Sequence, residues 1–350
     1  MAHELDDIRV VHINAGDEEG ADITLDYNAR RITISFFASS LPNKDEPLHN
    51  SPIENRIIGL LSQAVIAADE DYDDVINEAL DVLLLVGRSS FSQAAPPMRQ
   101  PHSTAQDLQS MLYPESLNFR LQTINGKAQI FQIRADEGVA LPDTPPEPRL
   151  DTIFQPDHQL SCYSSEDILV QYIFVSGSGI VVRVHVDGRD LLCKASRAGL
   201  WDSGLEQELV ALQSIQGAIA RTGVTIRAPC LYAYVIHAHS KAIIGLLRQW
   251  VPSSSRGKTL RDINMAAVPL NNRLKWADQV RQTVANLHSI GVIWGDGKPS
   301  NIIVNENDDI ELIDFAGGWS PGWVDKPLAE TVEGDDQAVG RIVRFLGVPA

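Results

Sequence analysis

The chain has 350 residues, which is long enough for two domains that each bury a hydrophobic core, and its sequence contains no apolar run of transmembrane length. The formal net charge is −17, and residues 1–150 carry most of it, with 24 acidic and 11 basic side chains. This acidity argues against nucleic acid or an anionic membrane as the main partner.

The N-terminus and the cysteines both indicate a cytoplasmic protein. The first residues are acidic, whereas a secretory signal peptide begins with basic and then apolar residues, so we expect no export. Cys162, Cys193 and Cys230 lack metal-ligand spacing and are typical of reduced thiols in the cytosol. The sequence leaves the oligomeric state open.

Residues 1–141 are predicted to form a separate α+β domain, in which we find no catalytic constellation. A proline-rich linker is predicted over residues 142–150. Apolar periodicity and turn residues give the elements of the domain: a hairpin over 22–37, helices over 53–65 and 75–86, a loop over 89–104 and a second hairpin over 117–133.

After the linker, the sequence predicts a five-stranded sheet with one helix. The strands cover 168–175, 180–186, 189–194, 231–237 and 242–247, and the helix covers 205–220. Lys194 ends an apolar strand, where a cation has no packing role. Glu208 borders the inward face of the helix, so it is the first candidate partner for Lys194, and Glu206 is the second.

A long helix over residues 271–290 leads into the stretch with the strongest chemical signal. There, two short strands over 302–304 and 310–313 form a hairpin. Folding of this hairpin would bring two carboxylates, an amide and an ammonium group together at the mouth of one site. These groups belong to Asp296, Lys298, Asn301 and Asp314. A magnesium nucleotide needs oxygen ligands for the metal, a cation for phosphate charge and a carboxylate that orients a hydroxyl group.

The motif Asp296-x-Lys298-Pro299-x-Asn301, followed by Asp314-Phe315, resembles the catalytic loop and metal-binding Asp of the eukaryotic protein kinase superfamily. The resemblance covers residues 168–346. Within that range, the segments 184–194, 322–326 and 332–335 are similar to a group of fungal kinase-like proteins.

This resemblance implies a bilobal fold after the N-terminal domain: a small lobe over 151–251, with a five-stranded antiparallel sheet, and a short, mainly helical large lobe over 252–350. It also implies ATP and Mg²⁺ as cofactors. Asp296 would be the catalytic base and Lys298 the cation for the γ-phosphate. Asn301 and Asp314 would be the magnesium ligands.

The small lobe would hold the rest of the nucleotide. The resemblance implies that a Lys194–Glu208 pair binds the α- and β-phosphates and that a glycine turn covers them. The hinge over residues 247–251 would hydrogen-bond adenine. The candidate residues in the turn and the hinge are Gly177, Gly179, Gln249 and Val251.

Several positions depart from the kinase pattern. Val182 occupies the position of the third glycine in the kinase glycine-rich turn. Trp294 replaces the usual His or Tyr before the catalytic Asp, and Ala316 replaces the glycine of Asp-Phe-Gly. Only one further helix is expected, near residues 334–336, where Asp335 or Asp336 would brace the catalytic loop. We therefore expect the helices that dock peptides in protein kinases to be absent, which favours a small-molecule substrate.

Three functions compete on this basis. The first is a Mg-ATP-dependent phosphotransferase that acts on a small molecule or a protein. The second is a kinase-fold enzyme repurposed for acid/base chemistry on a metabolite, and the third is a pseudokinase that acts as a binding module. Trp294 bears on the choice, since it could support the loop from behind, form a wall of the mouth, or fill the core.

Overall fold

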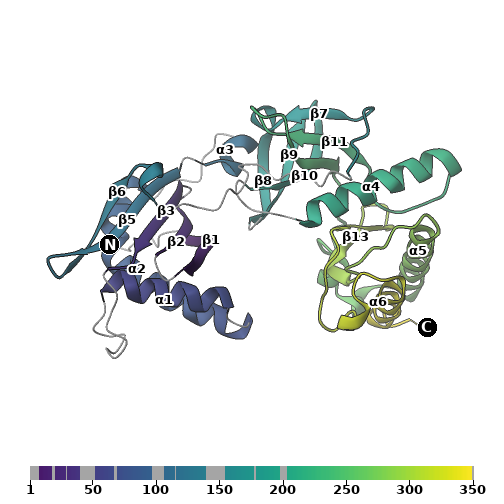
Figure 1. The fold of residues 1–350 in the computed structure, drawn as a ribbon. Coiled ribbons are helices and arrows are strands. Elements are labelled where there is room, and N and C mark those ends of the chain that lie inside the picture. The colour runs from purple at the N-terminus through teal and green to yellow at the C-terminus, as the bar shows by residue number, and fades with distance from the viewer. Residues whose placement is uncertain are drawn as a thin grey trace. The chain divides into compact units, whose positions relative to one another are not determined.

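The computed structural model describes residues 8–17, 20–28, 30–39, 52–66, 69–96, 106–114, 116–138, 154–176, 179–197 and 203–348. It is an α+β structure with mixed sheets and six α-helices among these residues (Figure 1). The chain divides into two compact units. Unit 1 consists of Met1–Thr104 and Tyr113–Pro145, and unit 2 consists of Ala105–Leu112 and Pro146–Ala350.

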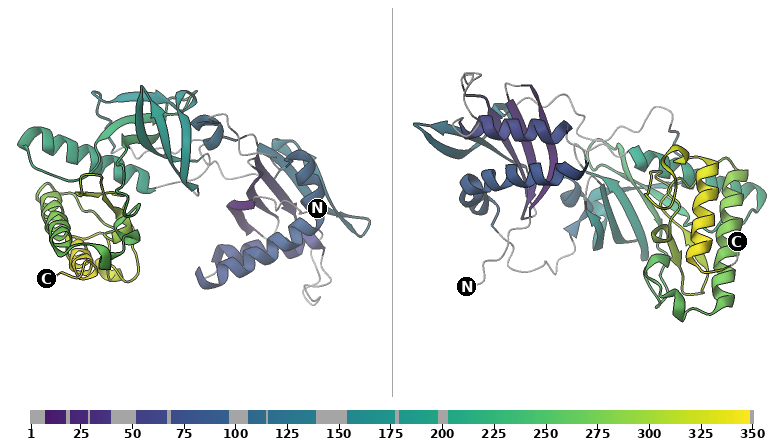
Figure 2. Two further views of the ribbon diagram at one scale, coloured as in Figure 1. Left: turned by 180° about the vertical axis from the view of Figure 1, so that it is seen from behind. Right: turned by 90° about the horizontal axis from the view of Figure 1, so that it is seen from below.

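Unit 1 is a five-stranded sheet covered on one face by two helices. The strand order is β1 (Ile8–Asp17), β2 (Gly20–Tyr27), β3 (Arg30–Phe37), β5 (Ser116–Ile124) and β6 (Lys127–Ile133). The β3 and β5 strands are parallel, and the other neighbours are antiparallel. Helices α1 (Ile53–Ile66) and α2 (Asp69–Ala94) lie across the sheet (Figure 2), where alternate residues of β2 such as Ile23 and Leu25 enter the core.

Both hairpins predicted in unit 1 are confirmed, and their turns use residues that tolerate positive φ. Asn125 has φ 52° and Gly126 has φ 73°, as a two-residue turn between β5 and β6 requires. The predicted loop over 89–104 is wrong in its first part, because α2 continues to Ala94. Phe91 is fully buried there against Tyr27 and Phe119, and this packing outweighs the weak helix propensity of the serines around it.

The sheet of unit 2 has seven strands rather than the predicted five. The five antiparallel strands occur as expected, in the spatial order β8 (Leu169–Ser176), β9 (Gly179–Val186), β10 (Arg189–Ser196), β12 (Ile243–Gln249) and β11 (Leu231–Ile236). A strand is added at each edge. β4 (Gln106–Asp107) pairs with β8, and β7 (Ser161–Ser164) pairs with β11 in parallel. The prediction of a wholly antiparallel sheet is therefore wrong at the edge where β7 pairs with β11.

Residues 1–141, which the sequence predicts to be one N-terminal domain, do not all belong to unit 1. β4 and the following helix α3 (Leu108–Leu112) belong to unit 2, although they precede β5 and β6 of unit 1. Leu108 and Leu112 are fully buried, and the Leu108 N–H donates to the carbonyl oxygen of Ile168 at 2.9 Å. The predicted linker over 142–150 lies outside the described residues.

Three helices and a hairpin complete unit 2. α4 (Ser203–Thr222) follows β10, α5 (Leu270–Ser289) lies beside α6 (Val332–Phe345), and β13 (Ile302–Val304) pairs with β14 (Ile310–Leu312) (Figures 1 and 2). One hydrophobic core joins them and includes Leu212, Trp276, Val280, Ile310 and Ile342. This shared core fixes the hairpin against α5, so the loops at its ends have defined positions.

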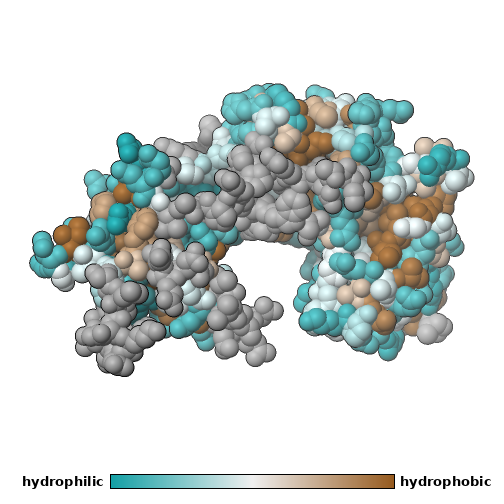
Figure 3. Space-filling model, in the orientation of Figure 1, coloured by the Kyte–Doolittle hydropathy of each residue, from teal (hydrophilic) through white to brown (hydrophobic). Residues whose placement is uncertain are grey.

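On the face shown in Figure 3, hydrophilic residues cover most of the described surface, and hydrophobic residues form smaller patches. None of the helices in the described part of the chain combines the length and the apolar character that a bilayer crossing requires.

Candidate functional site

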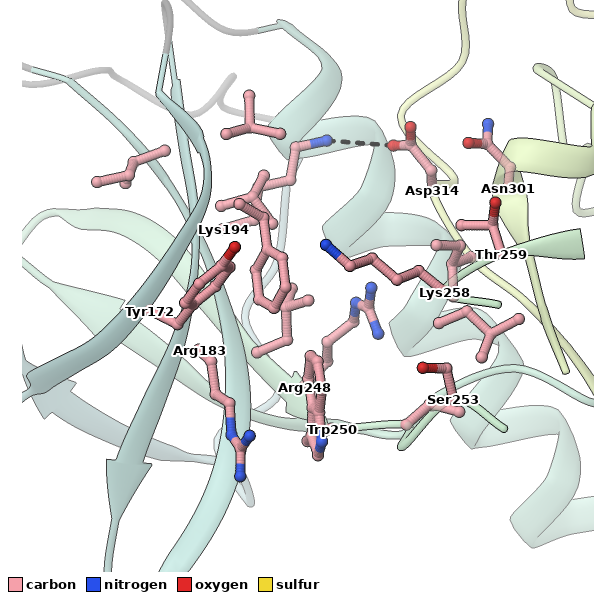
Figure 4. Close-up of a pocket in the computed structure, with 18 of the residues that line it drawn as sticks. Tyr172, Arg183, Lys194, Arg248, Trp250, Ser253, Lys258, Thr259, Asn301 and Asp314 are labelled. Carbon is pink, nitrogen blue, oxygen red and sulfur yellow. Dashed lines mark hydrogen bonds and ion pairs between the residues drawn. The ribbon is translucent and has the colours of Figure 1, made fainter. Parts of the chain in front are cut away.

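A cavity of about 1040 Å³ lies in unit 2, between the sheet, α4 and the β13–β14 hairpin (Figure 4). Six of the candidate residues from the sequence line it: Lys194, Glu208, Gly179, Val251, Asn301 and Asp314. The structure therefore brings together residues that are up to 135 positions apart in the sequence (Gly179 and Asp314). The volume is large enough for a nucleotide or a metabolite of similar size.

Four candidates do not line the described part of the cavity. Asp296 and Lys298 lie in the loop before β13. Gln249 is exposed, and its N–H already donates to the carbonyl oxygen of Cys230 at 2.9 Å, so it is not available as a hinge donor. Gly177 lies outside the described residues.

Lys194 is the centre of the polar contacts in the cavity. Its Nζ donates to Glu208 Oε2 at 2.9 Å and to Asp314 Oδ1 at 3.3 Å. The lysine comes from β10, the glutamate from α4, and the aspartate follows β14, so one ammonium group connects three elements. The Glu208 carboxylate is almost fully buried, and it is the first of the two glutamate candidates; Glu206 does not line the cavity.

The catalytic-loop candidates form a second polar group. Asn301 Nδ2 donates to the Asp296 carbonyl oxygen at 2.9 Å, and Lys298 Nζ contacts the Asp296 carboxylate and Ser320 Oγ. Asp296 Oδ1 is buried and has no hydrogen-bond partner among the described residues. A buried carboxylate oxygen without a donor is costly, so this atom could accept one further hydrogen bond.

Asp335, rather than Asp336, braces the loop that contains Asp296. Its carboxylate accepts the N–H of Trp294 at 2.8 Å and the N–H of Gly295 at 2.9 Å, and it lies 2.9 Å from His288 Nε2. Asp335 is 2% exposed, whereas Asp336 is exposed to solvent. The backbone before Asp296 is therefore held by one buried side chain of α6.

Trp294 fills the core beneath the loop that contains Asp296. Its side chain is 0% exposed, and its Nε1–H donates to the carbonyl oxygen of Ile313 at 3.0 Å. A Cβ at Gly297 would lie 3.1 Å from the Trp294 ring, so the loop passes close over the indole. The interpretation of Trp294 as a wall of the mouth is therefore wrong.

We expect Trp294→His to lower the free energy of unfolding by about 3 kcal/mol or more, because it removes buried ring area and leaves a polar group in the core. Ligand affinity and turnover should fall together with stability. Urea denaturation measures the first quantity. Trp319→His is the matched control, because Trp319 is 40% exposed, and it should cost far less. A stable Trp294→His protein that had lost only ligand affinity would contradict this role.

The segment after β14 holds Asp314 in an unusual conformation. Asp314 has φ 63°, in the left-handed region, and the Phe315 ring beside it is buried in the core. Asp and Asn adopt this region more readily than other residues with a Cβ. The backbone and the Phe315 anchor together direct the carboxylate toward Lys194.

The sequence did not identify six charged or aromatic residues of the cavity: Tyr172, Phe174, Arg183, Arg248, Trp250 and Lys258. Arg248 is 5% exposed, with Nε at 4.0 Å from Glu208 Oε1. Burial lowers the pKa of the Arg248 guanidinium, and the nearby carboxylates only partly oppose this effect. The signal that could have found it is the one used for Lys194, a cation within an apolar strand.

Trp250 forms an aromatic wall at the end of β12. Its ring stacks on Phe174 with centroids 5.5 Å apart, and Arg183 Cζ lies 5.1 Å from the Trp250 ring. Lys258 and Thr259 enter the cavity from the loop after this wall (Figure 4). Because π-faces stack on planar ligands, this end of the cavity suits an aromatic base.

The donors in the cavity fit a metal ion that is bound together with phosphate. The described residues contain no cluster of three or more His, Cys, Asp and Glu side chains that could hold a metal by themselves. Asp314 and Asn301 offer one carboxylate and one amide oxygen. Mg²⁺ is commonly held by one or two carboxylates plus substrate phosphates, so this set is adequate for it.

No protein-family model matches the chain, and a search of curated proteins finds no similar sequence.

Proposed function

We propose that the protein is a phosphotransferase of kinase-like fold that uses a magnesium-bound nucleoside triphosphate, with ATP as the nucleotide that the motifs imply. The observation that carries the proposal is the position of Lys194, which contacts Glu208 and Asp314 on the wall of the cavity that Asn301 also lines. The order of elements in unit 2 supports it: antiparallel strands, α4 between β10 and β11, then a helical part with the β13–β14 hairpin.

Each group has a role that its contacts suit. Lys194 would bind phosphate oxygens while Glu208 keeps the ammonium in place, and Asp314 with Asn301 would hold the metal. When bound, Mg²⁺ would neutralise phosphate charge. Asp296 would accept a hydrogen bond from the acceptor hydroxyl through its free Oδ1 and orient it, while Lys298 keeps the carboxylate in position. The acceptor is a hydroxyl group of a small molecule or a protein.

The test is the rise in melting temperature on addition of nucleotide, with Mg²⁺ and with EDTA. At 100 times Kd, binding adds about 2.7 kcal/mol to the stability of the native state, which corresponds to several degrees. Asp314→Asn should abolish the magnesium-dependent part, because it removes the charged ligand but tolerates the positive φ. Asp278→Asn, with an exposed side chain, is the control. A wild-type protein indifferent to millimolar magnesium nucleotides would refute the proposal.

The second candidate is a nucleotide-binding pseudokinase. It is favoured by the position of Asp296 and Lys298, which do not line the described cavity and contact each other. Such a protein would show the same Asp314-dependent rise in melting temperature but would transfer or release no phosphate. Repurposed acid/base chemistry has less support, because Trp294 does not form a wall of the cavity.

A further inference from the structure

The middle of the cavity presents hydrogen-bond donors without matching acceptors. In the view of Figure 4, the Arg248 and Lys258 side chains project into the space between Lys194 and Trp250. A guanidinium and an ammonium group carry N–H donors and no acceptor. This composition is unusual for a part of the cavity that, by the proposed function, would hold a nucleobase.

Arg248 has few partners for a buried guanidinium. Its Nε has no hydrogen-bond partner among the described residues, and its Nη1 makes a long hydrogen bond of 3.4 Å to the Gln249 carbonyl oxygen. The nearest carboxylate, Glu208, lies 4.0 Å away and already accepts a 2.9 Å hydrogen bond from Lys194. Buried donors of this kind are normally satisfied, and acceptors on a bound ligand or water would supply the missing partners.

Lys258 adds a second cation to the same space. Within the described part of unit 2 it has no hydrogen-bond or ion-pair partner, although it is exposed enough to find water. Asp314 and Glu208 are the carboxylates that line the cavity, and Lys194 contacts both. The donors of Arg248 and Lys258 are therefore available to a bound molecule.

The position of the base follows from the proposed function, on which this inference rests. If the phosphates lie at Lys194 and Asp314, the base extends toward the end of β12, where the stacked Phe174 and Trp250 rings form an aromatic wall. Arg248 lies on β12 two residues before Trp250, with its Nε 4.0 Å from Glu208, so its donors would meet an edge of a base placed between the two. Adenine presents N7 as an acceptor and its 6-amino group as a donor, whereas guanine presents N7 and O6, both acceptors.

We propose that the cavity prefers a 6-oxopurine nucleotide, such as GTP, over ATP, and that Arg248 and Lys258 determine this preference. A guanidinium can bond to O6 and N7 of guanine together, while the amino group of adenine would meet donors only. Discrimination between the two bases is large because binding of adenine would leave buried polar groups of the site unpaired.

The first experiment is a calorimetric titration of the full-length protein with MgATP, MgGTP and MgITP. We expect GTP to bind about tenfold or more tightly than ATP, the factor that corresponds to one good base-edge contact. ITP retains O6 and N7 but lacks the 2-amino group, so it should bind like GTP. If ITP bound as weakly as ATP, the 2-amino group would be the recognised feature and the assignment to Arg248 would be overturned.

The second experiment uses variants. Arg248→Met and Lys258→Met should each reduce the GTP-to-ATP affinity ratio toward one, mainly by weakening GTP. Arg256→Met is the control, because Arg256 contacts Asp308 and does not line the cavity, and its ratio should stay that of the wild type. If Arg248→Met does not fold, the wild-type nucleotide series and Lys258→Met decide the question.

The outcomes separate this inference from the proposed function. Binding of no magnesium nucleotide would refute both. Binding of ATP as tightly as GTP, or tighter, would leave the proposed function intact and overturn the base preference. A GTP preference that survived in both methionine variants would show that other residues determine it.

Discussion

Asp296→Asn should lower the rate of phosphate transfer or release by about 10²–10⁴-fold, the usual cost of losing a general base. The amide cannot accept a proton, and its NH₂ group would place a donor where the buried Oδ1 is free to accept. The melting temperature and the nucleotide affinity should change little. Asn301 bonds mainly to the Asp296 backbone, and Lys298 keeps its contact with Ser320.

The measurement is turnover of the magnesium nucleotide at saturating concentration, with the melting temperature recorded on the same preparation. Asp278→Asn serves as the control, because that aspartate lies on the exposed face of α5. Full activity in Asp296→Asn would show that the loop does not act as a kinase catalytic loop. A loss of nucleotide affinity equal to the loss of rate would instead assign Asp296 to binding.

Asp335→Ala should destabilise the protein by about 2–5 kcal/mol. It removes the acceptor for the Trp294 and Gly295 N–H groups and the partner of His288, and each buried group left unpaired costs about 1–3 kcal/mol. Since the same contacts hold the backbone before Asp296, turnover should also fall under conditions where the variant is folded.

Asp336→Ala is the matched control, because it removes the neighbouring, exposed aspartate from the same turn of α6. It should change the free energy of unfolding by no more than about 0.5 kcal/mol. Urea denaturation of both variants gives the comparison. Equal and small effects would mean that the Asp335 contacts contribute little to holding the loop.

The elements that carry strong local signals were predictable. The Asn125-Gly126 and Asp187-Gly188 turns specify hairpins through their positive φ, and the apolar stripe of residues 271–290 specifies α5. β4 and β7 carried no such signal. They are two and four residues long, and β7 has the sequence Ser-Cys-Tyr-Ser, so pairing with neighbours rather than propensity makes them strands.

The residues of the candidate site also differ in how far the sequence could predict them. Asp296, Asn301 and Asp314 share a motif with fixed spacing, so the sequence could place them at one hairpin. The sequence could not place Arg248 and Lys258 in the cavity. Strand periodicity predicts on which face of a sheet a side chain lies, but it does not predict which other elements pack against that face. Lys258 lies in the cavity because of the course of the loop after Trp250.

Residues 106–112 belong to unit 2 although they lie between two segments of unit 1, and this affects how the protein can be divided into fragments. A fragment that begins after residue 145 would lack β4 and α3, and with them Leu108 and Leu112, which are fully buried. It would also leave Leu169 and Val170 at an unpaired strand edge, and such edges promote association between chains. Unit 2 is thus assembled from two separate stretches of sequence. Insoluble behaviour of the short fragment would reflect the missing edge and not an unstable site.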